Sequence, residues 1–163
     1  MIRSTRGVTR RLDIPKPGEG RRGIDGYLTY LLRQANAAVR ITIDRSLAEF
    51  RITLPQYSAL TMLRSYGEIS SADLARLTLL TPQTIAAIVA NLEQRGLVAR
   101  SPDPVHGRVL RLKITKPGVV LVSRCRARTD KLEERLLGFL AASDRVAVRN
   151  WLVRVSTELG SAK

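Results

Sequence analysis

Between residues 70 and 96, hydrophobic positions follow a helical spacing that is interrupted once, by a bend at 79–80. Ser70 lies three residues before Asp73, which is the spacing of a capping box at the start of a helix. After the bend, Thr81 can cap a second helix. The pattern therefore predicts two short helices in succession.

The second of these helices has two contrasting faces. An apolar stripe at positions i, i+3, i+4 and i+7 turns toward a core: Ile85, Ile88, Val89 and Leu92. The opposite face carries short, uncharged side chains: Gln83, Thr84, Ala87, Asn91 and Gln94. An ordinary surface helix more often carries Glu and Lys pairs, whereas short amides and hydroxyls let a helix approach the base edges of DNA. Pro82 fits the first turn of this helix, and Gly96 ends it.

Beyond Gly96 the hydrophobic pattern changes from helical to alternating, which predicts strands at 97–100 and 108–114. In the longer strand, inward positions are expected at Leu110, Leu112 and Ile114, and solvent-facing ones at Arg111 and Lys113. Two prolines and a glycine between the strands force a turn. The result is a hairpin whose tip carries Asp103, His106 and Arg108.

Two amphipathic helices are predicted before this region. The first runs from about residue 24 to 49, with aliphatic residues along one side. The second begins at Thr53, which forms a capping box with Gln56, and ends at Gly67. Residues 68 and 69 can then supply a short edge strand beside the hairpin.

Two further helices are predicted after the hairpin, one opened by residues 116–118 and one capped by Ser143. Helices from both chain ends carry exposed apolar surface, which is what a symmetric dimer interface requires. We expect the following side chains at that interface: Leu28, Leu136, Leu140, Trp151, Leu152 and Val155.

Taken together, these motifs resemble the winged helix-turn-helix regulators of the MarR family. The resemblance extends from about residue 24 to 159 and is most specific in the stretch LEQRGLVARSPDPVHGR. It implies a mainly α fold with a small β-hairpin wing, in which the first, fifth and sixth helices of two chains intertwine. The wing departs from the family pattern, because His106 stands where a second aspartate is usual. A wing-stabilising pair between Asp103 and Arg108 is retained.

Four segments follow from this interpretation: a flexible basic arm (1–22), a dimerisation helix (23–52), a DNA-binding lobe (53–115) and C-terminal dimerisation helices (116–163). Double-stranded DNA is the expected partner, together with a second copy of the chain. The expected DNA contacts are Ser70, Thr81, Pro82, Gln83, Thr84, Ala87, Asn91, Arg95, Arg100, His106, Arg108 and Arg111.

The charge of the chain favours a polyanionic partner. Lys and Arg number 28 against 14 Asp and Glu, giving a formal net charge of +14. A membrane surface is the competing interpretation, but no predicted helix joins a basic face to bulky aromatic anchors. The charged N-terminus lacks the apolar segment of a signal peptide, so a cytoplasmic location is expected. The basic arm is either a solvated tail or a source of phosphate or minor-groove contacts.

The sequence offers little for catalysis or for a metal. Its one histidine lies in a turn, its one cysteine has no histidine partner, and paired carboxylates at a recognisable spacing are missing. We therefore expect no enzyme activity, no cofactor and no metal site. Cys125 falls in the predicted fifth helix and is expected to be a packing thiol.

Resemblance to the family also implies a small effector, often aromatic or anionic, bound between the dimer helices and the DNA-reading lobe. Arg33, Asn36 and Arg40 share a polar stripe on the first helix, and Tyr57 begins the second. These side chains could hold a carboxylate or phenolate; a solvated or phosphate-facing arginine row is the alternative.

We therefore expect a homodimeric repressor that binds a pseudo-palindromic operator and is released by a small molecule. The alternative function is that of an architectural protein that binds DNA without sequence preference. Such a protein would bind random duplex with similar affinity.

Overall fold

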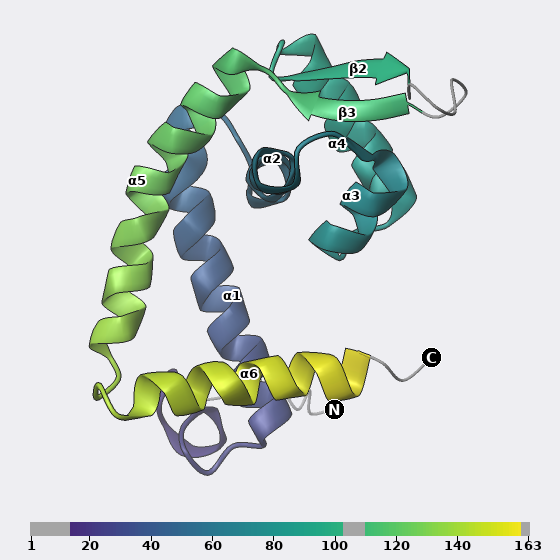
Figure 1. Cartoon of the computed structure of the whole chain (residues 1–163). Helices are drawn as coiled ribbons and strands as arrows, with labels where there is room; N and C mark the ends of the chain where they lie inside the picture. Colours follow the sequence, from purple (N-terminus) through teal and green to yellow (C-terminus); the bar gives the residue numbers. More distant parts are fainter. Residues whose placement is uncertain (1–13, 103–109, 161–163) are drawn as a thin grey trace, which may run out of the picture. The chain divides into compact units, whose positions relative to one another are not determined.

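The computed structural model describes residues 14–102 and 110–160. The chain forms two compact units, with the boundary between Arg40 and Ile41. Helices and one three-stranded antiparallel sheet make up the described chain, which confirms the expected mainly α fold with a small wing (Figure 1). The elements in chain order are η1 (Gly20–Arg22), α1 (Leu28–Leu47), η2 (Ala48–Phe50), α2 (Leu54–Tyr66), β1 (Ile69–Ser70), α3 (Ser71–Thr78), α4 (Pro82–Gln94), β2 (Val98–Pro102), β3 (Leu110–Ile114), α5 (Lys116–Gly138) and α6 (Asp144–Gly160).

In the first unit, Arg22 ties the segment before α1 to that helix. Its Nε donates to Oε1 of Gln34 at 3.2 Å, and its Nη1 donates to the carbonyl of Pro15 at 2.7 Å. These contacts lie within residues 1–22, for which the sequence predicted a flexible arm. The remainder of that arm, residues 1–13, lies outside the described residues.

Helix α1 also begins later than predicted, at Leu28 instead of residue 24. The backbone turns at Gly23 and Gly26, where the amide of Gly26 donates to the carbonyl of Gly23 at 2.9 Å. A Cβ at Gly26 would lie 2.3 Å from the carbonyl oxygen of Arg21, so only glycine fits this turn.

The core of the second unit forms around α2, α3, α4 and the sheet. The predicted stripe of α4 is buried along its whole length, which confirms the assignment of its inner face. The largest side chains packed with it come from three other elements: Leu60 and Leu63 of α2, Leu74 of α3 and Leu112 of β3. Burial of this apolar area is the main stabilising contribution in the lobe.

Side-chain caps fix where the helices of the lobe start, as the sequence predicted. The hydroxyls of Ser70 and Thr81 accept backbone amide hydrogens at the starts of α3 and α4, and the hydroxyl of Thr115, which the sequence analysis did not identify as a cap, does the same at α5. Thr53 and Gln56 form a reciprocal capping box at α2. Each cap satisfies amide groups that a helix leaves without partners, worth about 1 kcal/mol.

The sheet has the order β1-β3-β2, with Ile69 opposite Leu112 and Val98 opposite Ile114. The edge strand covers residues 69–70, one position later than predicted. The prediction that Leu110 faces inward is wrong, because this residue pairs with Pro102 at the far end of β2 and its side chain is 44% exposed. The wing tip, residues 103–109, lies outside the described residues.

Gly118 lets the first turn of α5 approach the root of the wing. A Cβ at this position would lie 2.4 Å from the carbonyl oxygen of Leu97 and 2.7 Å from Cγ1 of Ile114. No L side chain fits that space without moving backbone atoms.

We expect Gly118→Ala to lower the free energy of unfolding by about 1–3 kcal/mol, because it forces an overpacked contact of α5 with Leu97, just before β2, and with Ile114 of β3. Gly138→Ala is the matched control, since a Cβ there meets nothing within 4 Å. Alanine should be neutral or stabilising at that position, by up to about 1 kcal/mol. Urea unfolding followed by circular dichroism measures both changes, and equal stabilities would contradict the packing argument.

Candidate nucleic-acid interface

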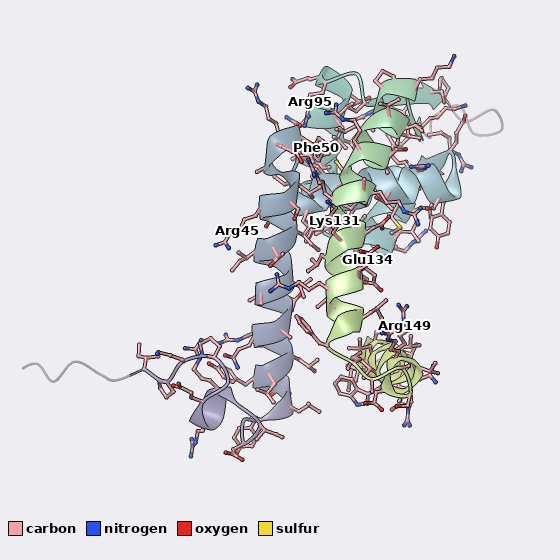
Figure 2. The ribbon with its side chains drawn as sticks, turned by 90° about the vertical axis from the view of Figure 1, so that its left-hand side faces the viewer. Arg45, Phe50, Arg95, Lys131, Glu134 and Arg149 are labelled. Atoms are coloured by element: carbon pink, nitrogen blue, oxygen red, sulfur yellow. The ribbon has the colours of Figure 1, made fainter. Side chains whose placement is uncertain are left out.

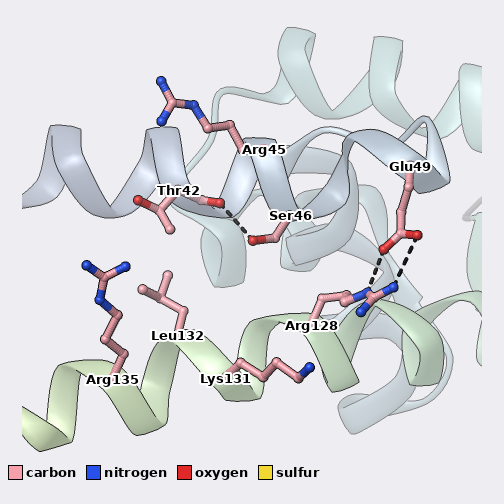
Figure 3. A pocket seen from close by; sticks show the side chains of 8 residues that line it. All are labelled: Thr42, Arg45, Ser46, Glu49, Arg128, Lys131, Leu132 and Arg135. Carbon is pink, nitrogen blue, oxygen red and sulfur yellow. Dashed lines mark hydrogen bonds and ion pairs between the residues drawn. The ribbon is translucent and has the colours of Figure 1, made fainter.

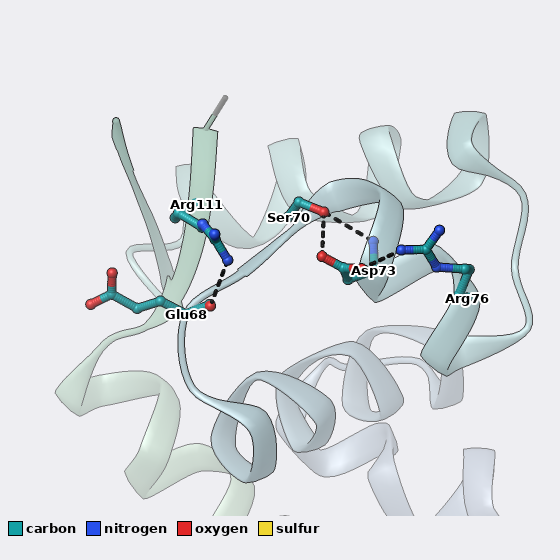
Figure 4. A network of polar contacts seen from close by, with 5 residues as sticks. All are labelled: Glu68, Ser70, Asp73, Arg76 and Arg111. Atoms are coloured by element: carbon teal, nitrogen blue, oxygen red, sulfur yellow. Dashed lines mark hydrogen bonds and ion pairs between the residues drawn. The ribbon is translucent and has the colours of Figure 1, made fainter. Parts of the chain in front are cut away.

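The start of α3 is locked by a polar network (Figure 4). The Ser70 hydroxyl accepts from the backbone amide of Asp73 at 3.1 Å and donates to its carboxylate at 2.6 Å. Arg76 forms an ion pair with the same carboxylate. The Ser70 hydroxyl and then the Arg76 guanidinium hold the pKa of Asp73 below its usual value. Ser70, a predicted DNA contact, is half-buried and engaged in this network.

The outer face of α4 is exposed, as predicted. Its five positions, Gln83, Thr84, Ala87, Asn91 and Gln94, all reach solvent. At the start of the helix, Thr81 and Pro82 are exposed as well, and the hydroxyls of Thr81 and Thr84 lie 2.8 Å apart. The face therefore offers hydroxyls and amides without charge, with a backbone that a partner can approach closely.

Asn91 is oriented by Gln56, a residue that sequence analysis identified only as a cap. The Gln56 carbonyl oxygen accepts from the Thr53 amide at 3.0 Å, so its amide nitrogen is the donor to Oδ1 of Asn91, at 2.9 Å. This bond uses one of the two lone pairs of the Asn91 oxygen and none of its amide hydrogens. The capping box was visible in the sequence, but the contact with α4 was not.

Arg95 has a structural role that the sequence did not reveal. Its guanidinium donates to the carbonyl of Arg51 at 3.0 Å and to that of Phe50 at 3.4 Å. Figure 2 shows Arg95 and Phe50 close together at one end of the lobe. These bonds fix the C-terminal end of α4 to the segment that joins α1 to α2.

The root of the wing is held by charged pairs. Arg100 pairs with Glu93 at 2.8 Å, and Lys113 pairs with Glu68 at 2.5 Å. Arg111, on β3, also donates to the carbonyl of Glu68 at 3.4 Å (Figure 4). These pairs are partly exposed, so each contributes little to stability, but together they orient the strands that carry the tip. The predicted tip residues Asp103, His106 and Arg108 lie outside the described residues.

The predicted effector residues are divided between the two units. Arg33, Asn36 and Arg40 are exposed on α1 in the first unit, where Arg33 lies 5.5 Å from the ring centre of Tyr30. Tyr57 belongs to the second unit, and its hydroxyl lies 3.1 Å from that of Thr129. There it lines a cavity of about 260 Å³ between α2 and α5, together with Thr61, Arg64, Ser65, Val122, Arg126 and Asp130.

Helix α6 contributes no buried residue within the described chain, although it carries several large apolar side chains. Trp151 is 37% exposed and Leu152 47% exposed, and Leu28 of the first unit is 57% exposed. The other predicted interface residues, Leu136, Leu140 and Val155, are partly buried. All six therefore retain apolar surface that a second chain can cover.

Cys125 is fully buried in the core of the second unit, as expected for a packing thiol, and burial raises its pKa. A raised pKa leaves less of the reactive thiolate. Residues 14–102 and 110–160 contain no group of His, Cys, Asp and Glu suited to a metal ion. None of the helices in this part of the chain is long and apolar enough to span a bilayer.

Known proteins resemble this chain in sequence and in fold. A sequence model of the MarR family matches residues 52–109. The HTH-type transcriptional repressor Rv2887 of Mycobacterium tuberculosis is 31% identical over 134 residues, covering 82% of this chain and 96% of the repressor.

Among solved structures, the fold is similar to that of BpsR from Bordetella bronchiseptica, with a TM-score of 0.75, 25% identity and coverage of 80% of this chain and 94% of BpsR. That structure concerns the regulation of BpsR DNA binding by 6-hydroxynicotinic acid. A mutant MarR from E. coli complexed with operator DNA shares the fold, with a TM-score of 0.73, 22% identity and coverage of 78% and 92%.

We expect Asp73→Asn to lower the melting temperature at neutral pH, because it removes the charged partner of Ser70 and Arg76. The folded-state pKa of Asp73 is depressed, so its stabilisation is present above the unfolded-state pKa and is lost as pH falls through the folded value. The difference between variant and parent should therefore shrink in acid. Thermal denaturation across a pH series measures it, with Asp130→Asn, in an exposed pair with Arg126, as control. A difference that does not change with pH would contradict this role.

Proposed function

This chain belongs to the MarR family of winged helix-turn-helix transcriptional regulators, and from that premise we propose that it represses transcription as a homodimer on a pseudo-palindromic operator. The observation that carries the proposal is the outer face of α4. It is exposed and uncharged within a chain of net charge +14. Positive charge elsewhere supplies affinity for phosphates, while neutral donors and acceptors on this face are suited to base edges.

The proposed base-reading residues are Gln83, Thr84 and Asn91, with Thr81, Pro82 and Ala87 allowing close approach to the groove. Gln56 donates to the Asn91 oxygen and not to its amide nitrogen, so the acceptors that we propose for the Asn91 amide hydrogens are N7 and O6 of guanine or O4 of thymine. Arg100 and Arg111 at the wing root, and His106 and Arg108 at the tip, are proposed to contact the backbone or minor groove. We leave out Arg95 and Ser70, because these side chains hold the end of α4 and the start of α3, whereas the wing-root contacts of Arg100 and Arg111 are partly exposed and can be exchanged for phosphate contacts.

The proposed dimer would bury the apolar surface of α6 and neighbouring helices. Trp151 and Leu152 are the strongest support, since large exposed apolar residues are unusual on a helix that packs only within its own chain. A two-fold dimer would place two α4 helices on successive faces of the duplex, with half-site centres about 10 base pairs apart or a near multiple.

The proposed effector is a small aromatic or anionic molecule that releases the operator. BpsR, whose DNA binding is regulated by 6-hydroxynicotinic acid, supports this class of ligand. Among the predicted effector residues, Tyr57 is our candidate for contact with an aromatic ring of the effector, because it lines the cavity between α2 and α5. We propose that Arg33, Asn36 and Arg40 also contact the effector, because they share one stripe of α1.

We expect Gln83→Ala to weaken binding to the operator by about 1–3 kcal/mol and to leave binding to random duplex nearly unchanged. The operator can be selected from random oligonucleotides, and fluorescence anisotropy then measures both affinities. Asn150→Ala, an exposed amide on α6, is the control for loss of a surface amide. Equal affinity of the parent for both duplexes would instead identify an architectural protein.

We expect Leu152→Asp to convert the dimer to monomer, because it buries an unpaired charge in the proposed interface, and to lower operator affinity at least about tenfold. Light scattering after size exclusion measures the mass. Asn150→Asp adds the same carboxylate at an exposed polar position of α6 and should leave the dimer intact. A monomeric parent protein would refute the arrangement.

A further inference from the structure

A cavity of about 440 Å³ lies between the C-terminal halves of α1 and α5, inside the second unit (Figure 3). It is separate from the predicted effector residues. Helix α1 and the following turn contribute Thr42, Arg45, Ser46 and Glu49, and α5 contributes Arg128, Lys131, Leu132 and Arg135.

The lining of this cavity carries four cationic side chains and one carboxylate. Glu49 is engaged by Arg128, at 2.6 Å from Nε and 3.4 Å from Nη2, and this contact raises the pKa of Arg128. Within residues 14–102 and 110–160, neither Lys131 nor Arg135 has a carboxylate partner. Arg135 points from α5 toward α1, whereas Arg45 turns away from α5 (Figure 3). The cavity therefore has uncompensated positive charge on one wall.

We propose that this cavity binds a small polyanion, with at least two negative charges on phosphate or carboxylate groups, through Arg128, Lys131 and Arg135. Guanidinium groups match both oxyanions in bidentate geometry, and the ammonium group adds a point charge. Leu132 is the one large apolar side chain of the lining, so the cationic side chains are what distinguish this cavity from an ordinary apolar site. The Ser46 hydroxyl already donates to the carbonyl of Thr42 at 2.9 Å, which leaves recognition to the cations.

The site is joined to α4 through residues 48–51, which we call the α1–α2 corner. Arg128 holds Glu49 from one side, and the Arg124 guanidinium lies 5.2 Å from the ring centre of Phe50. From the other side, Arg95 at the end of α4 donates to the carbonyls of Phe50 and Arg51. Arg51 has a φ of 51°, a conformation that needs such support in a residue other than glycine.

A polyanion that engages Arg128 competes directly with Glu49. The corner then loses its tie to α5, and the carbonyls that hold Arg95 are free to move with it. Bound polyanion thus weakens operator binding by loosening the end of α4. This regulatory step rests on the proposed operator-binding function, whereas the binding site itself does not.

Calorimetry on the full chain without DNA tests the site, using pyrophosphate and citrate at constant ionic strength. The tighter of the two identifies phosphate or carboxylate as the preferred group. Lys131→Ala with Arg135→Ala should weaken binding at least about tenfold, since two charge-assisted contacts are lost. Arg154→Gln, which removes one exposed charge from α6, should retain binding. Failure of both anions to bind, or equal binding by all three proteins, overturns the site.

Glu49→Gln gives a second readout that a purely structural role would not produce. Removing the competing carboxylate should tighten binding of the preferred anion about three- to tenfold, because Arg128 is then unpaired. Unchanged or weaker anion binding would contradict the proposed competition between Glu49 and the anion for Arg128. Anisotropy on the selected operator then tests regulation: the anion should lower operator affinity of the parent and act less on Glu49→Gln. If the anion binds but does not lower operator affinity, the regulatory step is wrong and the binding site stands. If no specific operator can be selected, the proposed repressor function is wrong, and the binding site is not affected.

Discussion

Burial of the apolar stripe of α4 is the interaction on which the rest of the lobe depends. Ile85, Val89 and Leu92 are fully buried, so the helix has one allowed rotation about its axis. That rotation is what exposes the neutral face carrying Gln83 and Thr84. A turn of the helix in either direction would bury amides without partners and expose aliphatic side chains, both of which are costly. The exposure of the face that we propose to read DNA is thus a consequence of the core.

Arginine residues of this chain fall into two groups that composition alone does not separate. Arg95 and Arg128 are used internally, on carbonyls and a carboxylate of the segment between α1 and α2. Others, such as Arg45 and Arg135, face solvent or a cavity. A net charge of +14 therefore predicts the class of partner, while the local partners of each guanidinium decide which side chains are available to it.

The α1–α2 corner concentrates several of these internal contacts in four residues. Two of its carbonyls accept hydrogen bonds from Arg95, at the end of α4, and the Glu49 carboxylate accepts from Arg128 of α5. A segment held from two sides by exposed charged contacts is sensitive to a competing ion, since each contact is modest by itself. In the regulation that we propose, charge bound near α5 therefore acts on the end of α4 through this corner.

The sequence by itself determined the helices of the lobe, their caps, the inner and outer faces of α4 and the existence of the wing, because these depend on neighbours within a few residues. Tertiary structure decided the rest. The link from Gln56 to Asn91 and the ties of Arg95 join residues more than thirty positions apart, and no local pattern encodes them. Leu110 lies at an inward position of the alternating pattern, yet β3 extends past the core at that point and leaves the side chain exposed. Periodicity specifies the side of a strand on which a residue lies, whereas burial requires that another element reaches it.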